Sequence, residues 1–173
     1  AMIHRMNSDL ANDLGNLSQR VLSMIFKNCD GVMPALPAEP RDEDAALLAS
    51  ADAMLDAVRA QIDLQAFHEA LRVIWQVVSD ANRYVDNTAP WGLKKTDPPR
   101  MQEVLAVLAE VIRQVAILVQ PVMPEATSKM LAQLGVPDNA RGFDTIGGAV
   151  RLPAGHVIDK PEPVFPRYIV EEA

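Results

Sequence analysis

The sequence predicts an all-α protein, an antiparallel bundle of about five helices followed by an extended C-terminal strap. Apolar residues recur at the three-and-four spacing of a helix face in several long segments. Prolines and glycines separate these segments by mostly short connections, which favours helices that run antiparallel to their neighbours. With 173 residues, 49% of them hydrophobic, the chain can build one good core. We expect residues 1–140 to form the bundle and residues 141–173 to form the strap.

The first helix is expected from about Ser8 to Asn28, with Ser8 or Asn7 as its N-cap. Its apolar stripe consists of Leu10, Leu14, Leu17, Val21 and Met24. The stretch "GVMPALPAEPRDED" then ends helical structure, because a glycine and three prolines interrupt it.

Two further helices are expected before residue 86. The second follows Arg41, and the third, which we expect Asp63 to cap, keeps the three-four rhythm over about twenty residues. Their apolar positions are Leu47, Leu48, Ala51, Met54, Leu55 and Val58, then Leu64, Phe67, Leu71, Ile74, Val78, Ala81 and Val85. The stretch "DNTAPWGLKKTDPP", residues 86–99, is predicted to be a turn region.

The fourth helix is expected to begin at Asp97 and Pro98, because proline suits the first helical position, and to end at Pro121. Its apolar positions are Met101, Val104, Leu105, Leu108, Ile112, Val115 and Val119. A short fifth helix runs to about Leu134, with Gly135 placed for a left-handed cap. After Gly142 the pattern fails and the chain becomes proline-rich. The apolar residues Val164, Phe165, Tyr168 and Ile169 near its end need a partner, either this bundle or another domain.

Several functions are disfavoured by composition. One cysteine, Cys29, cannot form an internal disulfide, which favours a cytoplasmic setting, and no apolar run approaches the roughly 20 residues of a membrane span. We expect no membrane partner. His4, His68 and His156 lack metal-ligand spacing, so no metal site is expected, and His68 and Cys29 are interpreted as packing residues. The net charge of −7 argues against charge-driven nucleic-acid binding, but it leaves room for a local site that binds unpaired bases.

The first helix also carries a polar row. Asn12, Asn16 and Arg20 are each four residues apart and therefore lie one above another on a helix. Asn is a poor helix residue, and a merely solvated face would be better served by Glu, Lys or Gln. From the residues alone, this row fits a solvated face, interhelical hydrogen bonds or a binding surface. Trp91, which follows a proline in a predicted turn, most often plugs a core in such a position.

Two stretches carry a family resemblance. "RMNSDLANDLGNLSQRVLSMI" and "ANRYVDNTAPWGLKKTDPPRM" resemble the anticodon-binding helical domain of methionyl-tRNA synthetases, which are class I enzymes. "PVMPEATSKMLAQLG" and "KPEPVFPRY" fit the same domain, so that the resemblance covers nearly the whole chain. The Asn–Asn–Arg row is shared loosely with other class I synthetases, and its combination with "APW" is more specific to the methionine enzymes.

The resemblance implies the roles of particular residues in reading the CAU anticodon loop of methionine tRNA. Trp91 would stack on the first anticodon base, Asn16 and Arg20 would hydrogen-bond to it, and Asn12 and Pro90 would shape the pocket. This agrees with the chemistry of single-stranded RNA recognition, in which bases stack on aromatic rings while amides and guanidinium groups bind their edges. We therefore expect the Trp91 indole and the Arg20 guanidinium within roughly 10 Å of each other at one tip of the bundle.

Other polar residues of this region allow two interpretations. Lys94 and Lys95 are candidates for phosphate contacts, although two adjacent lysines are equally ordinary on a solvated surface. Asn82 is interpreted as a tie between a helix end and the next turn. Arg83 fits either a structural role or an RNA contact.

The chain contains neither the HIGH-like nor the KMSKS-like sequence of a class I catalytic domain. We therefore expect a catalytically inactive fragment of a larger enzyme, whose catalytic domain is a further partner. The intact enzyme would attach methionine to its tRNA using ATP with Mg, whereas this chain would hold no cofactor. Some family members append a further tRNA-binding domain, and since this chain carries none we expect "VEEA" to be the natural terminus. The alternatives are the corresponding domain of another class I synthetase, for cysteine, leucine, isoleucine or valine, and a helical protein-interaction module.

Overall fold

The computed structural model describes residues 2–164, and the predicted all-helical class is confirmed there: the described part contains no strand. Its α-helices are α1 (Met2–Asn28), α2 (Asp42–Asp52), α3 (Met54–Asp63), α4 (Phe67–Thr88), α5 (Pro90–Thr96), α6 (Pro98–Leu118) and α7 (Pro124–Leu134). Two short 3-10 helices follow, Asp138–Ala140 and Phe143–Thr145. None of the described helices is both long and apolar enough to cross a membrane.

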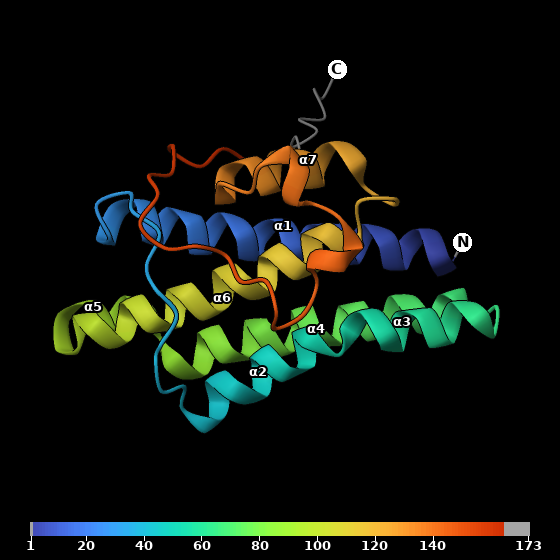
Figure 1. The fold of residues 1–173 in the computed structure, drawn as a ribbon, viewed down its shortest axis with the longest axis horizontal. Coiled ribbons are helices and arrows are strands. Elements are labelled where there is room, and N and C mark those ends of the chain that lie inside the picture. Colours follow the sequence, from blue (N-terminus) through green and yellow to red (C-terminus); the bar gives the residue numbers. More distant parts are fainter. Residues whose placement is uncertain (1, 165–173) are drawn as a thin grey trace, which may run out of the picture.

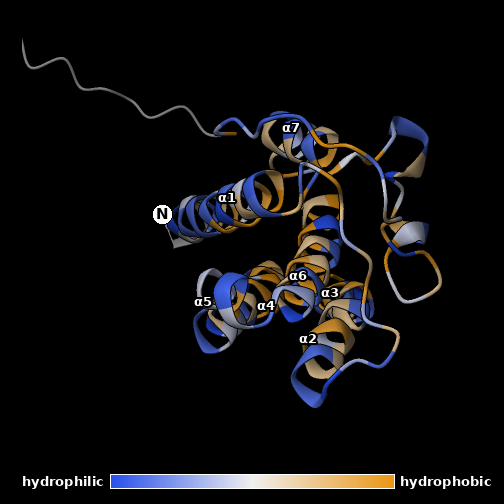
Figure 2. Ribbon diagram, turned by 90° about the vertical axis from the view of Figure 1, so that its left-hand side faces the viewer, coloured by the Kyte–Doolittle hydropathy of each residue, from blue (hydrophilic) through white to orange (hydrophobic). Residues whose placement is uncertain are grey.

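Helix α6 is the central helix of the bundle. It packs against α1, α2, α4, α5 and α7, and it runs antiparallel to α1 and α4 (Figure 1). Every residue from Val104 to Leu118 is buried, as expected for a helix surrounded on all sides. Seen from the α5 end, apolar residues gather around α6, whereas hydrophilic residues lie on the outer sides of the surrounding helices (Figure 2).

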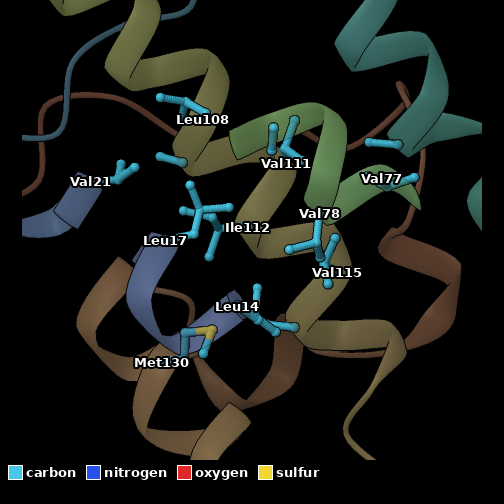
Figure 3. Packing of buried hydrophobic residues seen from close by; sticks show 14 of the residues in the cluster. Leu14, Leu17, Val21, Val77, Val78, Leu108, Val111, Ile112, Val115 and Met130 are labelled. Atoms are coloured by element: carbon cyan, nitrogen blue, oxygen red, sulfur yellow. The ribbon is translucent and has the colours of Figure 1, made fainter. Parts of the chain in front are cut away.

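The core confirms most of the apolar stripes predicted from the sequence, but the prediction is wrong for Leu64 (75% exposed) and Phe67 (56% exposed), which lie where the chain turns between α3 and α4. Leu14, Leu17 and Val21 of α1 are fully buried and meet Leu108 and Ile112 of α6 (Figure 3). Residues of α4 and α7 complete the same cluster, among them Val78 and Met130. Each fully buried Leu or Ile side chain contributes about 1.5–3 kcal/mol relative to an exposed one. The core therefore holds the bundle together along its whole length.

Several predicted boundaries are wrong. Helix α1 begins at Met2 rather than near Ser8, so neither Ser8 nor Asn7 caps it. The predicted second helix is divided at Ala53 into α2 and α3. Asp63 ends α3 instead of capping the next helix, which begins at Phe67 after Gln65 adopts a left-handed conformation (φ 58°). The apolar rhythm of residues 54–64 belongs to α3, which folds back along α4.

The segment predicted as a turn contains helix α5. Ala89 ends α4 in a left-handed conformation (φ 45°, ψ 64°), and Pro90 then occupies the first turn of α5. The predicted caps further along the chain are confirmed. The Asp97 side chain accepts a hydrogen bond from the Arg100 backbone N–H (3.3 Å), and Gly135 ends α7 with φ 81°.

The last described segment runs back along the bundle. The Met33 N–H donates to His156 O, the Gly155 N–H to Met33 O, and the Ile158 N–H to Gly31 O, at 2.7–2.9 Å. Val164, the last described residue, is buried, whereas Phe165, Tyr168 and Ile169 lie outside the described residues. The division of the chain near residue 140 stays a prediction.

Candidate nucleic-acid interface

Trp91 and Arg20 lie together at one end of the bundle. Trp91 is in the first turn of α5 and is 50% exposed, and the guanidinium carbon of Arg20 on α1 lies 5.9 Å from the centroid of its ring. Figure 1 shows this end on the side of α5, away from the N-terminus of α1. The distance confirms the predicted proximity of the two groups and falls within the range of a cation–π contact.

The joint between α4 and α5 presents the Trp91 ring to solvent. Ala89 turns the chain in a left-handed conformation, which costs a residue with a Cβ roughly 1–2 kcal/mol, and Pro90 fixes the next φ. Pro90 is buried and Leu93 packs against the core cluster, so these two side chains anchor α5. Trp91 points outward between them. The interpretation of Trp91 as a core plug is therefore wrong.

The polar row of α1 lies on the surface beside this pair. Asn12, Asn16 and Arg20 are all exposed. An open groove of about 540 Å³ runs between α1 and α4, and its lining consists of Asp13, Asn16, Arg20, Ser79, Asn82, Arg83 and Asp86. Two members of the predicted row thus line a polar groove next to the exposed indole.

A different residue of α1 makes the interhelical contact here. The indole N–H of Trp75 on α4 donates a 2.9 Å hydrogen bond to the Asp13 carboxylate. The Asn82 side chain donates to Val78 O within α4, and Arg83 lies 3.7 Å from Asp80 at the surface. Lys94 and Lys95 are exposed in the last turn of α5. Their contact with phosphate stays a prediction.

A buried cluster of charged and polar side chains lies where α2, α4 and the start of α6 meet. Arg100, at the start of α6, donates two hydrogen bonds to Asp44 of α2 (2.7 and 2.9 Å), and Tyr84 Oη of α4 donates to the same carboxylate at 2.6 Å. Asp44 and Arg100 are almost completely buried. Glu43 and Glu103, both partly exposed, also accept hydrogen bonds from Arg100. The cluster joins α2, α4 and α6 close to the Trp91 end.

The titration of this cluster follows from its hydrogen bonds. Burial alone would raise the pKa of Asp44, but hydrogen bonds from Arg100 and Tyr84 outweigh it and lower that pKa below its ordinary value. Burial and the bond to Asp44 raise the pKa of Tyr84 well above its ordinary value. The hydrogen bond to Asp44 likewise raises the pKa of Arg100. The pair is therefore ionised, and Tyr84 neutral, at neutral pH.

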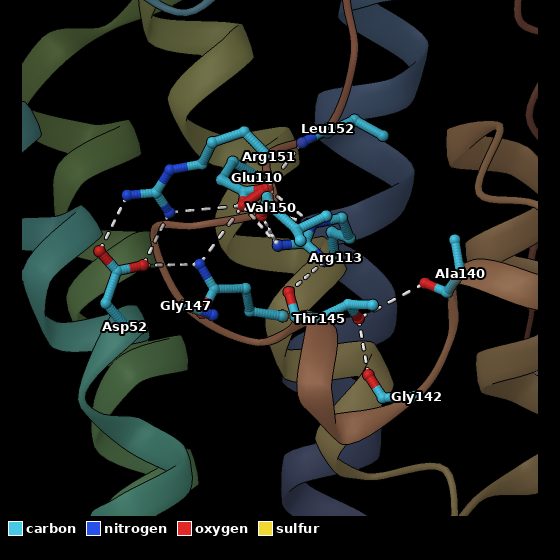
Figure 4. Close-up of polar contacts among 11 residues, drawn as sticks. Asp52, Glu110, Arg113, Ala140, Gly142, Thr145, Gly147, Val150, Arg151 and Leu152 are labelled. Carbon is cyan, nitrogen blue, oxygen red and sulfur yellow. Dashed lines mark hydrogen bonds and ion pairs between the residues drawn. The ribbon is translucent and has the colours of Figure 1, made fainter.

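A second polar cluster holds the C-terminal segment on α6 (Figure 4). The buried Arg113 pairs with Glu110 and donates to Val150 O (2.7 Å) and Thr145 O (3.0 Å), while Glu110 accepts from the Leu152 N–H. Arg151 forms a two-point contact with Asp52 of α2 (2.7 and 2.8 Å). Burial opposes ionisation of Asp52, yet the bonds from Arg151 and Gln114 lower its pKa.

Cys29 and His68, which the sequence analysis interprets as packing residues, are only partly buried. Cys29 is partly buried, and burial followed by the nearby Asp30 raises the pKa of its thiol, which disfavours a nucleophilic role. His68 is partly buried on α4 and lies 3.0 Å from the Arg72 Nε, which donates to it.

Solved structures place this fold among the helical domains of aminoacyl-tRNA synthetases. The chain superposes on Mycobacterium tuberculosis methionyl-tRNA synthetase in complex with methionyl-adenylate with a TM-score of 0.88 and 48% identity, covering 96% of this chain and 33% of that one. The apo form of the same enzyme gives a TM-score of 0.87 and 49% identity, covering 95% of this chain and 33% of that one.

Sequence comparison gives the particular family. The family described as the anticodon binding domain of methionyl tRNA ligase matches residues 34–173. The methionine–tRNA ligase of Rhizobium meliloti is 52% identical over 169 residues, covering 98% of this chain and 33% of the relative, and that of Brucella suis is 50% identical, covering 98% and 32%. The chain belongs to the family of anticodon-binding domains of methionyl-tRNA ligases. It spans about a third of the length of the relatives that it matches.

Proposed function

We propose that this chain reads the CAU anticodon of methionine tRNA, with Trp91 stacking on the first base and Asn16 and Arg20 binding the edge of that base. The observation that carries this proposal is the half-exposed indole of Trp91, with the Arg20 guanidinium 5.9 Å from its ring centroid. An exposed aromatic ring beside hydrogen-bonding groups is the arrangement by which proteins hold an unstacked base. Asn12 and the buried Pro90 would shape the surroundings of the base.

The distance between the Arg20 guanidinium and the Trp91 ring limits where a base can stack. Stacked atoms lie about 3.5–4.0 Å apart, so a base held between the indole and the guanidinium would need about 7–8 Å. The observed 5.9 Å is too short. On the face that Arg20 covers, a base can therefore stack only if the guanidinium moves away from the ring and donates to the edge of the base instead.

The energies favour this exchange. An exposed cation–π contact is worth about 0.5–1 kcal/mol, whereas one base–aromatic stack contributes about 1–3 kcal/mol. The hydrogen bonds that Arg20 and Asn16 then make add to the stack. In the unbound chain, Arg20 keeps the ring covered on one side and remains within reach of the incoming base.

The chain would serve as the tRNA-recognition domain of a longer methionine–tRNA ligase. That enzyme would activate methionine with ATP and Mg in a catalytic domain outside this chain and then transfer it to the tRNA. We assign no step of that reaction to residues of this chain, since they would bind and position the anticodon loop only.

The test is binding of a fluorescent CAU anticodon stem-loop to the 173-residue chain. Trp91→Ala should weaken binding roughly 5- to 150-fold, the equivalent of one lost stack of about 1–3 kcal/mol. The control is Leu64→Ala, which removes a 75% exposed side chain between α3 and α4 and should leave binding unchanged. Equal affinities for the wild type and the Trp91→Ala chain would refute the assignment.

A further inference from the structure

A hydrogen bond between two side chains ties helix α4 to helix α1 beside the polar groove. The indole N–H of Trp75 donates to the Asp13 carboxylate at 2.9 Å. The Trp75 ring is partly buried and packs against the hydrophobic core, so its N–H group is held in one place. The Asp13 side chain lines the same groove as Asn16 and Arg20. The position of its carboxylate therefore affects the groups that are proposed to bind a base.

Asp13 has few alternative partners along α1. On a helix, a side chain meets those three and four residues away in each direction, which for Asp13 are Asp9, Leu10, Asn16 and Leu17. Of these four, only Asn16 can donate a hydrogen bond to a carboxylate, because a carboxylate accepts and leucine is apolar. Hydrogen bonds between amide and carboxylate side chains at this spacing stabilise helices. Without the indole, the Asp13 carboxylate would therefore have the Asn16 amide as its partner along α1.

The Asn16 amide is open in the structure. Among the residues whose side chains the structure describes, none forms a hydrogen bond with the Asn16 side chain, which is exposed at the groove. Its N–H groups and its carbonyl oxygen are therefore available to a ligand. An amide that already donated to a carboxylate would exchange one hydrogen bond for another on binding a base and would gain little.

We propose that Trp75 is a positioning residue for anticodon recognition: its indole N–H holds the Asp13 carboxylate away from Asn16 and keeps the Asn16 amide open to the edge of a base. This role rests on the proposed function, in which Asn16 binds the edge of the first anticodon base. It differs from that of a fastening between α1 and α4, which either replacement would break alike. Loss of the indole N–H releases the carboxylate onto Asn16, whereas loss of the carboxylate leaves Asn16 open.

The contact between Asp13 and Asn16 is tested without RNA. The side-chain amide protons of Asn16 are followed in proton–nitrogen correlation spectra and are assigned by their absence in Asn16→Ala. Trp75→Phe keeps an aromatic ring but removes the N–H donor. We expect the Asn16 signals of Trp75→Phe to lie downfield of those of Trp75→Phe/Asp13→Ala, because only the first variant has a carboxylate that can accept from the amide. Both variants lack the indole, so its effect on nearby protons cancels.

Identical Asn16 signals in the two variants would overturn the proposal, because Asp13 would then stay away from Asn16 without the help of the indole. Thermal unfolding followed by circular dichroism checks that each variant is folded. Trp75→Leu, which also lacks the N–H donor, replaces Trp75→Phe in both comparisons if that variant does not fold.

Binding of the CAU stem-loop tests the consequence for RNA. Trp75→Phe should weaken binding roughly 3- to 10-fold, the equivalent of one lost hydrogen bond. Asp13→Ala and Trp75→Phe/Asp13→Ala should bind no more weakly than the wild type. If Asp13→Ala binds as weakly as Trp75→Phe, the pair only fastens α4 to α1 and the proposal is wrong. Equal binding by Trp75→Phe and the wild type would also overturn it.

The proposed function is decided separately by Trp91→Ala in the same series. If Trp91→Ala weakens binding and Trp75→Phe does not, the anticodon function stands and the role of Trp75 is wrong. If Trp91→Ala binds like the wild type, the anticodon function fails, and the spectra alone decide whether Trp75 holds Asp13 away from Asn16.

Discussion

Removal of the Asp44 charge should destabilise the chain strongly. In Asp44→Asn, the buried Arg100 loses its two-point partner and Tyr84 loses an ionised acceptor. Breaking a buried ion pair by removing one partner costs about 3–5 kcal/mol. Because Glu43 and Glu103 still contact Arg100 from the partly exposed side, we expect the lower end of this range, about 3 kcal/mol. For a domain of this size, that corresponds to a decrease in Tm of about 6–12 °C.

Thermal unfolding followed by circular dichroism measures this effect. The matched control is Asp138→Asn, which removes a 99% exposed carboxylate 3.3 Å from Arg141 and should change the stability by less than about 1 kcal/mol. A Tm for Asp44→Asn within 2 °C of the wild type would contradict this expectation, because it would show that Arg100 does not need its buried partner. The double replacement Asp44→Leu/Arg100→Met should recover part of the loss, since it leaves no unpaired charge in the interior.

The same cluster predicts how stability changes with pH. The pKa of Asp44 in the folded chain lies below its unfolded value of about 3.8, so its contribution is fully present above that pH and is lost as the pH falls through the lower folded value. Asp52 acts in the same direction. Wild-type stability should therefore decrease below about pH 4, and the Asp44→Asn chain should lose less over that interval.

Three further outcomes are expected. The effects of Arg20→Ala and Trp91→Ala on stem-loop binding should be non-additive by about 0.5–3 kcal/mol in a double-mutant cycle, because both side chains are proposed to hold one base; strict additivity would show that they act on different parts of the RNA. The affinity should depend weakly on salt, with a log–log slope shallower than about −3, because few phosphates are neutralised by a chain of net charge −7, and a slope that corresponds to six or more phosphates would contradict this expectation. The chain alone should give no methionine-dependent ATP–pyrophosphate exchange, and measurable exchange would show that it contains a catalytic site.

The main helices and their buried faces could be predicted from the sequence, because long stretches with the three-four rhythm have one dominant way to bury their apolar side. The caps at Asp97 and Gly135 were also correct, since each depends on local chemistry alone. Helix α5 could not be predicted in this way. It has seven residues, includes Gly92, and follows Ala89, an ordinary helix former that adopts a left-handed conformation only in its tertiary setting.

The buried ion pairs could not be predicted either. Asp44 lies in an acidic first turn, and Arg100 directly follows two prolines at the start of a helix; both positions are typical of solvated helix ends. No sequence pattern links these two residues, which are 56 positions apart. The proximity of Trp91 and Arg20 could be predicted, because the family resemblance gave both residues one ligand and therefore required them at the same tip of the bundle. The exposure of Leu64 and Phe67 carried no such signal, since both residues continued the apolar pattern expected of a core.

Under the proposed function, the Trp91 end of the bundle discriminates the first anticodon base. The most direct test compares the affinities of the wild type and of Trp91→Ala/Arg20→Ala for the CAU stem-loop and for one with guanine in place of the first cytosine. The wild type should prefer CAU roughly 5- to 150-fold, the usual worth of well-placed contacts to a base edge, and the double variant should bind both RNAs within about twofold of each other. A double variant that keeps the wild-type preference would contradict this role of Trp91 and Arg20, because the first base would then be read elsewhere on the chain.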